Sequence, residues 1–448
     1  MNRHLTTLAA ACAAWLSLSG CRCGKPEPVR GAPPLAAAAA VAAVAVADKP
    51  AVLATLPDER EREFVFAERG GGVAWADERG GRFQVVHDGR AGKTYDAVGP
   101  IALSPDGRRC AHGAQADGQW RMVVDGVEGQ GFDEVQSPVF SPDGAHLAYQ
   151  ARAGERWHLV VDTTVGPGTR SRLLGPEFGA DSSRIALIDD ADDQGFGRLV
   201  VSDLDFKGQT VVEARASELL VNGDRTQVAA IGASGGKQRV LTFAFDRPGQ
   251  VRRGPDFDAV SRLAFGPGGR SLAYLAERAG QRMVVLDGKE ETVPPGELFG
   301  PLVVRPDGKA VGIFRLDGDA VRLHQAFAGA GPDEVTPGGG EELTYSPGGL
   351  HAYASSRRGR QLVVVGGKDG PPFDRVVSPS FSPDGRFLVY RARQDGRRFV
   401  VVADPSGKTT RQLPTYEQVF PVRFTADGKS VAYGVKDGKS LRWVVEPL

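Results

Sequence analysis

A four-residue turn motif recurs along this chain about every 40 residues and constrains the fold more than any other feature. Each copy lies between two short apolar segments. The clean copies read Ser-Pro-Asp-Gly at 104–107, 141–144 and 382–385. Altered copies occupy 266–269, 305–308, 346–349 and 425–428, and degenerate copies occupy 67–70, 180–183 and 222–225. Successive fourth positions are 36 to 44 residues apart, so we expect ten units of similar length.

The chemistry of the motif predicts a tight turn between antiparallel strands. Proline presets φ at the second position of a type I turn, aspartate suits the third, and glycine accepts the positive φ that follows. A short strand with alternating large and small residues comes next, as at 147–149 and 388–390. The small residue would allow neighbouring units to pack closely. We predict that each motif aspartate caps its own turn and has no catalytic role.

An aromatic residue followed by an acidic one marks the end of many units. These aromatic corner residues are Tyr95, Phe132, Phe257, Phe373 and Tyr416. We interpret each ring as a wedge at the crossing into the next unit. An aromatic cage for a ligand is the alternative, and the spread of the corners along the whole chain disfavours it.

A strand-rich repeat of this length predicts an all-β fold, a β-propeller of four-stranded antiparallel blades. About ten units favour a single large ring, with two smaller rings, or irregular units near 183 and 225, as alternatives. The last unit supplies three strands, at 421–424, 430–434 and 441–445. The segment 51–56 mirrors 409–413. We therefore predict that this N-terminal segment adds the fourth strand to the last blade and closes the ring, which removes exposed sheet edges.

The repeat resembles the WD40-like PD40 repeat of the TolB family of propellers. The matching residues are Phe-Ser-Pro-Asp-Gly at 140–144 with Leu-Ala-Tyr at 147–149, and the same five residues at 381–385 with Leu-Val-Tyr at 388–390. The resemblance covers nearly all of residues 51–448. The resemblance implies a propeller fold and does not indicate a ligand. The α/β domain that precedes the propeller in TolB has no counterpart in this sequence.

The N-terminal residues indicate export and lipid attachment. Residues 1–20 have a basic start and an apolar segment from 5 to 18, which is typical of a secretory signal peptide. The apolar segment is shorter than the ~20 residues that a membrane-spanning helix needs. The sequence Leu-Ser-Gly-Cys that ends at Cys21 resembles the lipobox of bacterial lipoproteins. The resemblance implies cleavage before Cys21 and lipidation of that residue.

The segment that follows predicts a tether and a location. Residues 21–50 are rich in proline and alanine, which is typical of a linker between a lipid anchor and a domain at 51–448. Arg22 stands where an aspartate would retain a lipoprotein in the inner membrane, so the resemblance implies the outer membrane of the bacterial envelope. The membrane is thus one expected partner, through the lipid.

Two motifs suggest chemistry. Gly232, Ser234 and Gly236 match a Gly-x-Ser-x-Gly nucleophile pattern, but strand-like segments flank them where a hydrolase needs a helix, so we predict a hairpin. Residues 190–195 resemble the start of a calcium loop, with Asp190, Asp192 and Gln194 as weak candidate ligands. A solvated acidic turn is the favoured interpretation. We predict no other cofactor and no catalytic residues.

The net charge and the remaining polar residues do not indicate a further partner or functional site. The chain has 55 Lys and Arg against 55 Asp and Glu, so nothing favours nucleic acid as a partner. The arginines Arg393, Arg397 and Arg398 surround a glycine and are interpreted as a solvated hairpin tip. Cys110 and His112 replace Leu and Tyr of a Leu-Ala-Tyr strand, so we predict that both are packing residues.

These observations favour a lipid-anchored binding or scaffold module of the cell envelope, monomeric and non-catalytic. Its ligand would be an envelope protein, a peptide or a glycan held by the loops of one face. The alternative is an envelope enzyme, a glycan lyase or hydrolase with its site at the mouth of the propeller channel. A purely structural role is a third hypothesis. Perturbed titratable groups at one mouth would favour the enzyme, and a bare apolar patch would favour a protein partner.

Overall fold

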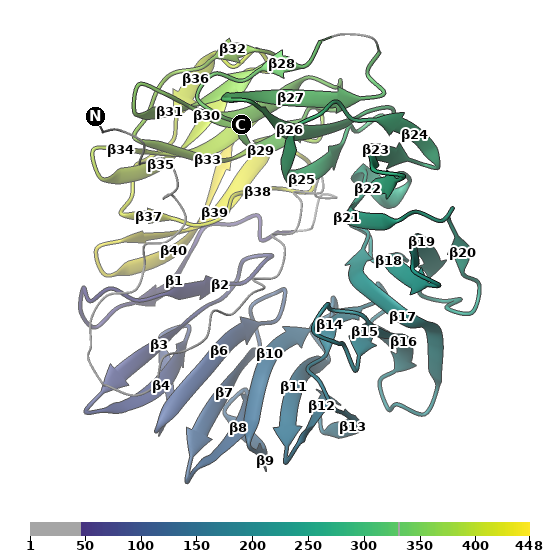
Figure 1. Cartoon of the computed structure of the whole chain (residues 1–448). Helices are drawn as coiled ribbons and strands as arrows, with labels where there is room; N and C mark the ends of the chain where they lie inside the picture. The colour runs from purple at the N-terminus through teal and green to yellow at the C-terminus, as the bar shows by residue number, and fades with distance from the viewer. Residues whose placement is uncertain (1–45, 330–331) are drawn as a thin grey trace, which may run out of the picture. The chain divides into compact units, whose positions relative to one another are not determined.

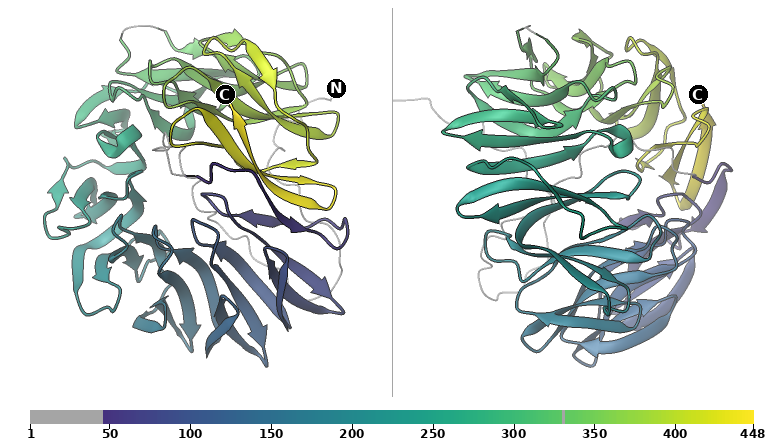
Figure 2. Two further views of the ribbon diagram at one scale, coloured as in Figure 1. Left: turned by 180° about the vertical axis from the view of Figure 1, so that it is seen from behind. Right: turned by 90° about the vertical axis from the view of Figure 1, so that its right-hand side faces the viewer.

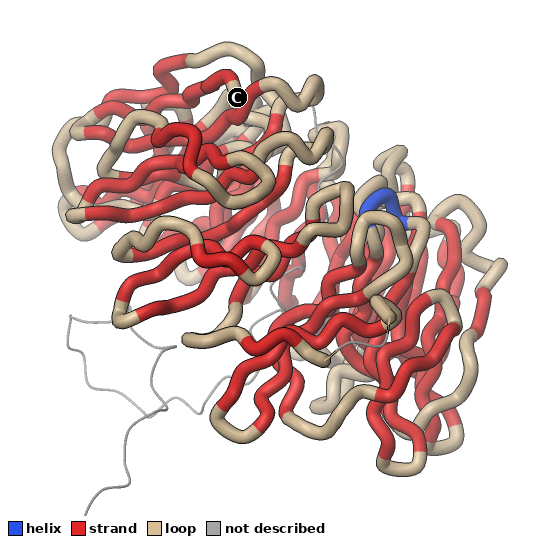
Figure 3. The backbone as a smooth tube through the Cα atoms, turned by 90° about the horizontal axis from the view of Figure 1, so that it is seen from above, coloured by secondary structure: helices blue, strands red, loops and turns tan. Residues whose placement is uncertain are grey.

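The computed structural model describes residues 46–329 and 332–448. Strands account for nearly all of the regular structure in these residues, and the single helical turn is the 3-10 segment Pro267–Gly269 (Figure 3). The strands form antiparallel sheets that we number as blades 1 to 10 in chain order. The predicted all-β class is confirmed.

The first three blades are regular four-stranded sheets (Figure 1). Blade 1 contains β2 (Phe64–Phe66), β3 (Val73–Arg79), β4 (Arg82–His87) and β5 (Arg90–Tyr95). Blade 2 contains β6 (Ala97–Leu103), β7 (Cys110–Ala116), β8 (Gln119–Val124) and β9 (Val127–Phe132). Blade 3 contains β10 (Glu134–Phe140), β11 (Leu147–Ala153), β12 (Arg156–Val161) and β13 (Thr164–Thr169).

Blades 4 and 5 are joined in one seven-stranded sheet. Its strands are β14 (Leu174–Phe178), β15 (Arg184–Asp189), β16 (Gly197–Asp203), β17 (Gln209–Val221), β18 (Gln227–Ser234), β19 (Lys237–Ala244) and β20 (Arg252–Arg253). The 13-residue strand β17 is the fourth strand of blade 4 and continues as the first strand of blade 5. The irregularity expected near 183 and 225 is therefore a shared strand.

Four regular sheets follow, blades 6 to 9. Blade 6 contains β21 (Ala259–Phe265), β22 (Leu272–Arg278), β23 (Gln281–Leu286) and β24 (Lys289–Thr292). Blade 7 contains β25 (Glu297–Val304), β26 (Val311–Asp317), β27 (Ala320–Ala326) and β28 (Glu334–Val335). Blade 8 contains β29 (Glu341–Tyr345), β30 (His351–Arg357), β31 (Arg360–Val365) and β32 (Lys368–Asp369). Blade 9 contains β33 (Arg375–Phe381), β34 (Leu388–Gln394), β35 (Arg397–Ala403) and β36 (Thr409–Gln412).

Blade 10 joins the two ends of the described chain. It contains the C-terminal strands β37 (Gln418–Val419), β38 (Arg423–Phe424), β39 (Ser430–Asp437) and β40 (Ser440–Pro447), with β1 (Ala51–Thr55) beside β40. The predicted closing strand is confirmed by the register Ala51 to Trp443 and Thr55 to Ser440. The first strand of this blade is shorter than expected and is split into β37 and β38, both paired with β39.

Buried apolar clusters connect the blades into one closed ring. Each pair of successive blades contributes side chains to a shared cluster. Blades 10 and 1 do so too, because Leu441 and Phe420 pack with Phe64, Val73 and Trp75. The views in Figure 2 show the same succession of blades from behind and from the side. The single ring is therefore observed, and the alternative of two rings is wrong.

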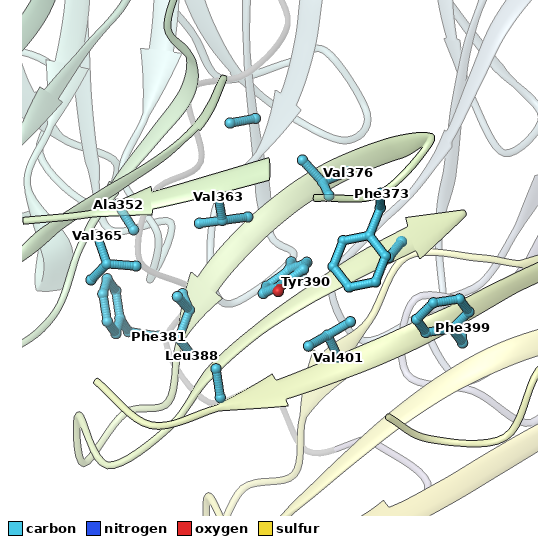
Figure 4. Close-up of a cluster of buried hydrophobic side chains, with 13 residues drawn as sticks. Ala352, Val363, Val365, Phe373, Val376, Phe381, Leu388, Tyr390, Phe399 and Val401 are labelled. Atoms are coloured by element: carbon cyan, nitrogen blue, oxygen red, sulfur yellow. The ribbon is translucent and has the colours of Figure 1, made fainter. Parts of the chain in front are cut away.

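The cluster between blades 8 and 9 shows how the alternating strands pack (Figure 4). Leu388 and Tyr390 of β34 face Ala352 and Val363 of blade 8. The intervening Val389 belongs to the cluster with blade 10. Each fully buried side chain of this size contributes ~1.5–3 kcal/mol relative to exposure. The alternation of large and small residues thus distributes the core over both faces of every blade, as predicted.

The repeated turns form as expected. The Ser104 hydroxyl donates to Asp106 at 2.7 Å, and Asp106 accepts from the Arg108 amide, so the aspartate caps its own turn. In the degenerate copy near 183 the amide of Ser182 bonds to the Gly179 carbonyl. That turn therefore spans 179–182, one residue earlier than the sequence pattern indicates, because Ser182 takes the positive φ of 59°.

The aromatic corners are wedges between blades, as predicted. The Phe132 ring lies edge-on to Tyr149 of the next blade with centroids 6.4 Å apart, and Phe373 contacts Tyr390 in the same way at 6.2 Å. At three of these corners, the aspartate after the ring (Asp133, Asp258 or Asp374) accepts a hydrogen bond from a hairpin amide, which the sequence did not indicate. Asp374 accepts a hydrogen bond at 2.8 Å from the amide of Asp395, at the tip of the β34–β35 hairpin. The corner therefore fixes the hairpin of the blade that follows.

Candidate functional site

Three arginines form a row across blade 9, on the face that looks toward blade 10. In the strand register, Arg375 of β33 lies opposite Arg393 of β34, and Arg393 lies opposite Arg398 of β35. A fourth arginine, Arg391, is two residues from Arg393 and therefore on the same face. All four line a cavity of about 250 Å³, completed by Val377, Ala392 and Val419. We call this cavity the arginine pocket.

Two of the four side chains are anchored to blade 10. The Arg391 guanidinium donates to the Val419 carbonyl at 3.2 Å and to the Ser378 hydroxyl at 3.1 Å. Its Nε is buried and has no hydrogen-bond partner in the described structure. Arg398 donates to the Glu417 carbonyl. These bonds hold both guanidinium groups at the wall of the pocket.

Among the described residues that line the arginine pocket, none is acidic. Within residues 46–329 and 332–448, none of the four arginines is in an ion pair. Two acidic side chains of this region have other partners. Asp374 pairs with Arg360 at 3.8 Å and accepts from the Asp395 amide, and Glu342 accepts from the Ser378 amide. Burial lowers the pKa of Arg391, and Glu342 opposes this shift while Arg375 adds to it. Like charges directly opposite each other destabilise a sheet.

The same place in blade 6 gives a direct comparison. A cavity of about 190 Å³ lies there, lined by Ala259, Glu277 and Arg282 at the positions of Arg375, Arg393 and Arg398. That row holds one acid and one base. Blade 3 also places an acid opposite a base in this row, with Glu134–Arg152 at 3.4 Å.

Arg393 and Arg398 flank the predicted hairpin tip, where Arg393 is exposed and Arg398 is half-buried. Both also line the arginine pocket, which the sequence did not indicate. Arg397 is exposed at the same tip and pairs with Asp437 of blade 10 at 3.0 Å. The two-residue turn at Asp395 pairs 394 with 397 and 393 with 398, so the sequence did contain a signal for their register. Nothing local in the sequence placed Arg375 beside them, since a bulge in β33 shifts its register after Val377.

The candidate calcium loop uses its carboxylates in other contacts. Asp190 accepts a hydrogen bond from the Arg170 amide at 2.6 Å. Asp192 accepts from the Gln194 amide at 3.0 Å and pairs with Arg215 at 2.7 Å. The described part of the chain contains no group of three or more His, Cys, Asp or Glu side chains placed to hold a metal ion.

The other candidates have structural roles. Ser234 ends β18, and Gly235 and Gly236 form the turn to β19, so the Gly-x-Ser-x-Gly pattern is a hairpin as predicted. Cys110 is buried in β7, and burial raises the pKa of its thiol to about 12, which keeps the thiol protonated. His112 is buried beside Tyr95.

The candidate lipidation site, Cys21, lies outside the described residues, as does the whole segment 1–45. Among the residues from 46 onward that the structure describes, no helix has the length and apolar character needed to cross a membrane.

The strand order and the shared clusters define the protein class as a ten-bladed β-propeller, closed by its N-terminal strand. No protein-family model matches the chain, and no curated protein matches it either. Similar solved structures include TolB from Acinetobacter baumannii, which is 15% identical, with 71% of this chain and 81% of that chain covered and a TM-score of 0.27.

Two further propellers are similar at the same level. The β-propeller domain of the Trilobed protease from Pyrococcus furiosus is 13% identical, covers 63% of this chain and 96% of its own, and has a TM-score of 0.31. The Dos1 propeller is 11% identical, covers 78% and 92%, and has a TM-score of 0.40. The fold assignment rests on the strand pairing of this chain itself.

Proposed function

We propose that the protein is a binding module of the bacterial cell envelope that holds an acidic ligand in the arginine pocket. The observation that carries the proposal is the row of Arg375, Arg393 and Arg398 without a carboxylate partner. Such a row lowers the stability of the sheet unless an anion occupies it. Planar guanidinium groups bind carboxylates and phosphates through paired hydrogen bonds.

The chemistry of the pocket supports binding over catalysis. A glycan lyase or hydrolase needs a carboxylate, an imidazole or a similar group to transfer a proton beside the bound substrate. The lining consists of four arginines, two valines and one alanine. Arginine stays charged at physiological pH, so these side chains are suited to holding an anion and unsuited to exchanging a proton with it.

We further propose that a lipid on Cys21 attaches the propeller to the outer membrane and that residues 22–50 act as the tether. The support is the lipobox-like sequence before Cys21 and the proline- and alanine-rich segment after it. Several acyl chains, each adding ~0.8 kcal/mol per buried CH₂ group, would keep the protein on the membrane.

Binding is tested by calorimetric titration of the propeller with citrate, a small anion with three carboxylates. We expect citrate to bind the wild type and Arg393→Gln to weaken binding at least about tenfold, because one charged hydrogen-bond partner is removed. The matched control is Arg282→Gln in the corresponding cavity of blade 6, at the position of Arg398. Equal affinities for wild type and Arg393→Gln would contradict the proposal.

Attachment is tested separately by fractionating cells that express the wild type or Cys21→Ala. We expect the wild type to incorporate labelled fatty acid and to sediment with outer membranes, while Cys21→Ala does neither. A pull-down from both strains then shows whether partners depend on the anchor. Membrane association of Cys21→Ala equal to that of the wild type would contradict the lipid anchor.

A further inference from the structure

A second cavity lies where the ring closes, between blades 10 and 1. Its volume is about 350 Å³, larger than that of the arginine pocket. Apart from Glu68 and Arg423, its lining residues are uncharged. We call this cavity the seam pocket, and its apolar wall includes Val65, Phe66, Leu103, Phe420, Pro421 and Trp443.

The seam pocket lies beside the break in the first strand of blade 10. In blade 9 this strand is the unbroken β33, whereas in blade 10 residues 420–422 separate β37 from β38. The rings of Phe66 and Phe420 are 4.4 Å apart, and both side chains are only half-buried, as are Val65 and Leu103. Apolar surface that remains accessible to water favours an apolar occupant.

The first described residues of the chain lie against the wall of the seam pocket. The Ala47 carbonyl accepts a hydrogen bond from the indole of Trp443 at 3.0 Å, and the Ala47 amide donates to the Arg69 carbonyl at 2.6 Å. Residues 48–50 are exposed, whereas Val46 and Ala47 are half-buried. Followed toward its N-terminus, the chain therefore returns to the ring beside this pocket.

The next residues in that direction have the composition that the seam pocket requires. Residues 37–45, which lie outside the described residues, are seven alanines and two valines. Val44 is three residues from Ala47, a reach of at most about 11 Å. A covalently linked segment is present at a high effective concentration, which gives it an advantage over a free apolar partner. Connectivity and composition therefore select the chain itself as the occupant.

We propose that the seam pocket binds residues 37–45 of the chain's own tether, with the side chain of Val44 inserted among the apolar residues of its wall. This inference goes beyond the proposed function and uses neither the arginine pocket nor the lipid. Docking removes nine residues from the free part of the tether, a loss of at most about 32 Å of reach. The propeller would thus be held closer to its point of attachment.

Elastase, which cuts after small residues such as alanine, measures the accessibility of the segment in the full-length protein. Val41→Asp combined with Val44→Asp should raise the rate of cleavage within 37–45 at least about fivefold, because a charged side chain is costly to bury and cleavage follows the open population. The matched control is Val29→Asp, the same change in the tether outside the segment, which should leave the rate within about twofold of the wild type. Equal rates in all three proteins would overturn the proposal.

A peptide added in trans tests the pocket itself. The receptor is the full chain with residues 37–45 replaced by glycine and serine, and the probe is a synthetic peptide of residues 37–47 with added lysines for solubility. In fluorine NMR with fluorotryptophan, the probe should shift the signal of Trp443 and leave that of Trp157 in blade 3 unchanged. The wild type should need at least about tenfold more peptide, because its own segment competes.

Each outcome of the peptide titration decides the proposal. No shift of the Trp443 signal in the glycine and serine variant would overturn it. Equal affinity of the wild type and this variant would show a pocket open to an apolar segment of another protein, and would overturn docking of the tether. Arg393→Gln should change neither experiment, so failure here leaves anion binding standing, and failure of citrate binding leaves this inference standing.

Discussion

At the scale of single residues, the arginines that we propose for binding lower the stability of their own sheet, because like charges lie opposite each other. Arg393 has an arginine opposite it on each side, whereas Glu277, at the same place in blade 6, has an arginine on one side and an alanine on the other. The two blades have the same strand pairing at this place and differ in these side chains. The unfavourable row is therefore a property of blade 9 and not of the fold.

Removing the central charge should stabilise the folded protein while it removes binding. We expect Arg393→Gln to raise the free energy of unfolding by about 0.5 kcal/mol at low salt, because two like-charge cross-strand contacts disappear. Arg282→Gln, which has Glu277 opposite it, should bring no gain. Urea unfolding at low and high salt measures the difference, and a loss of stability in Arg393→Gln would contradict the account.

A second residue-scale prediction concerns pH. Burial lowers the pKa of His112 from 6.5 to about 4, and neither ring nitrogen has a hydrogen-bond partner in the described structure. Between these two values the unfolded chain binds a proton that the folded chain does not. Stability should therefore fall as the pH decreases from about 6.5 to about 4, and no loss from this group is expected above that range.

The variant His112→Phe isolates this effect. Tyr149 and Tyr390 show that a ring of this size fits the position in other blades. Between about pH 7.5 and pH 5 the wild type should lose about 2 kcal/mol more than the variant does. Urea unfolding at both pH values measures the loss. The same loss in both proteins would show that His112 is not the group responsible.

At the scale of elements, the repeated turn both ends a strand and contacts its neighbour. A Cβ at Gly107 would lie 2.5 Å from the backbone nitrogen of Gly72, in the preceding blade. The turn glycine is thus required by its φ of 75° and also by the space available. Other copies share the positive φ but have more room, since a Cβ at Gly144 or Gly385 would lie 3.2 Å from the nearest atom.

A matched pair of glycines separates the two requirements. Gly118 lies in the same blade with a φ of 76°, and a Cβ there would meet nothing within 4 Å. Gly118→Ala should cost about 1–2 kcal/mol through its backbone conformation alone. Gly107→Ala should cost clearly more, because the backbone of Gly72 must move as well. Chemical denaturation measures the free energy of unfolding of both variants. Equal losses would show that the contact between Gly107 and Gly72 adds nothing to the cost.

Much at the element scale could be predicted from the sequence, because it depends on local chemistry. The turns follow from Pro, Asp and Gly at fixed positions, and the strand alternation follows from the spacing of residues such as Leu388 and Tyr390. The pocket could be predicted only in part. Arg393 and Arg398 meet through a local hairpin, whereas Arg375 joins them through a bulged strand and Arg391 is held by a carbonyl of the next blade.

At the scale of the whole molecule, β1 closes the ring by pairing with β40. Leu56, just after β1, is 2% exposed and belongs to the cluster that connects blades 10 and 1. Without this strand, the edge of β40 would be open to pairing with other chains. The segment that follows the tether is therefore part of the fold.

Closure predicts a contrast between two residues of the same segment. Leu56→Ala should lower the free energy of unfolding by about 2–5 kcal/mol, because it leaves a cavity in the closing cluster. Val52→Ala, at a position that is 68% exposed, should change it by about 0.5 kcal/mol or less. Guanidinium unfolding measures both. A small effect of Leu56→Ala would show that the ring does not depend on its closure.

Whether the arginines of blade 9 form the binding site can be seen in a crystal structure of the propeller soaked with citrate. We expect density for citrate in the arginine pocket, with carboxylates within hydrogen-bond distance of its arginine side chains. Density for the probe at another blade, with the arginine row left to water, would contradict it.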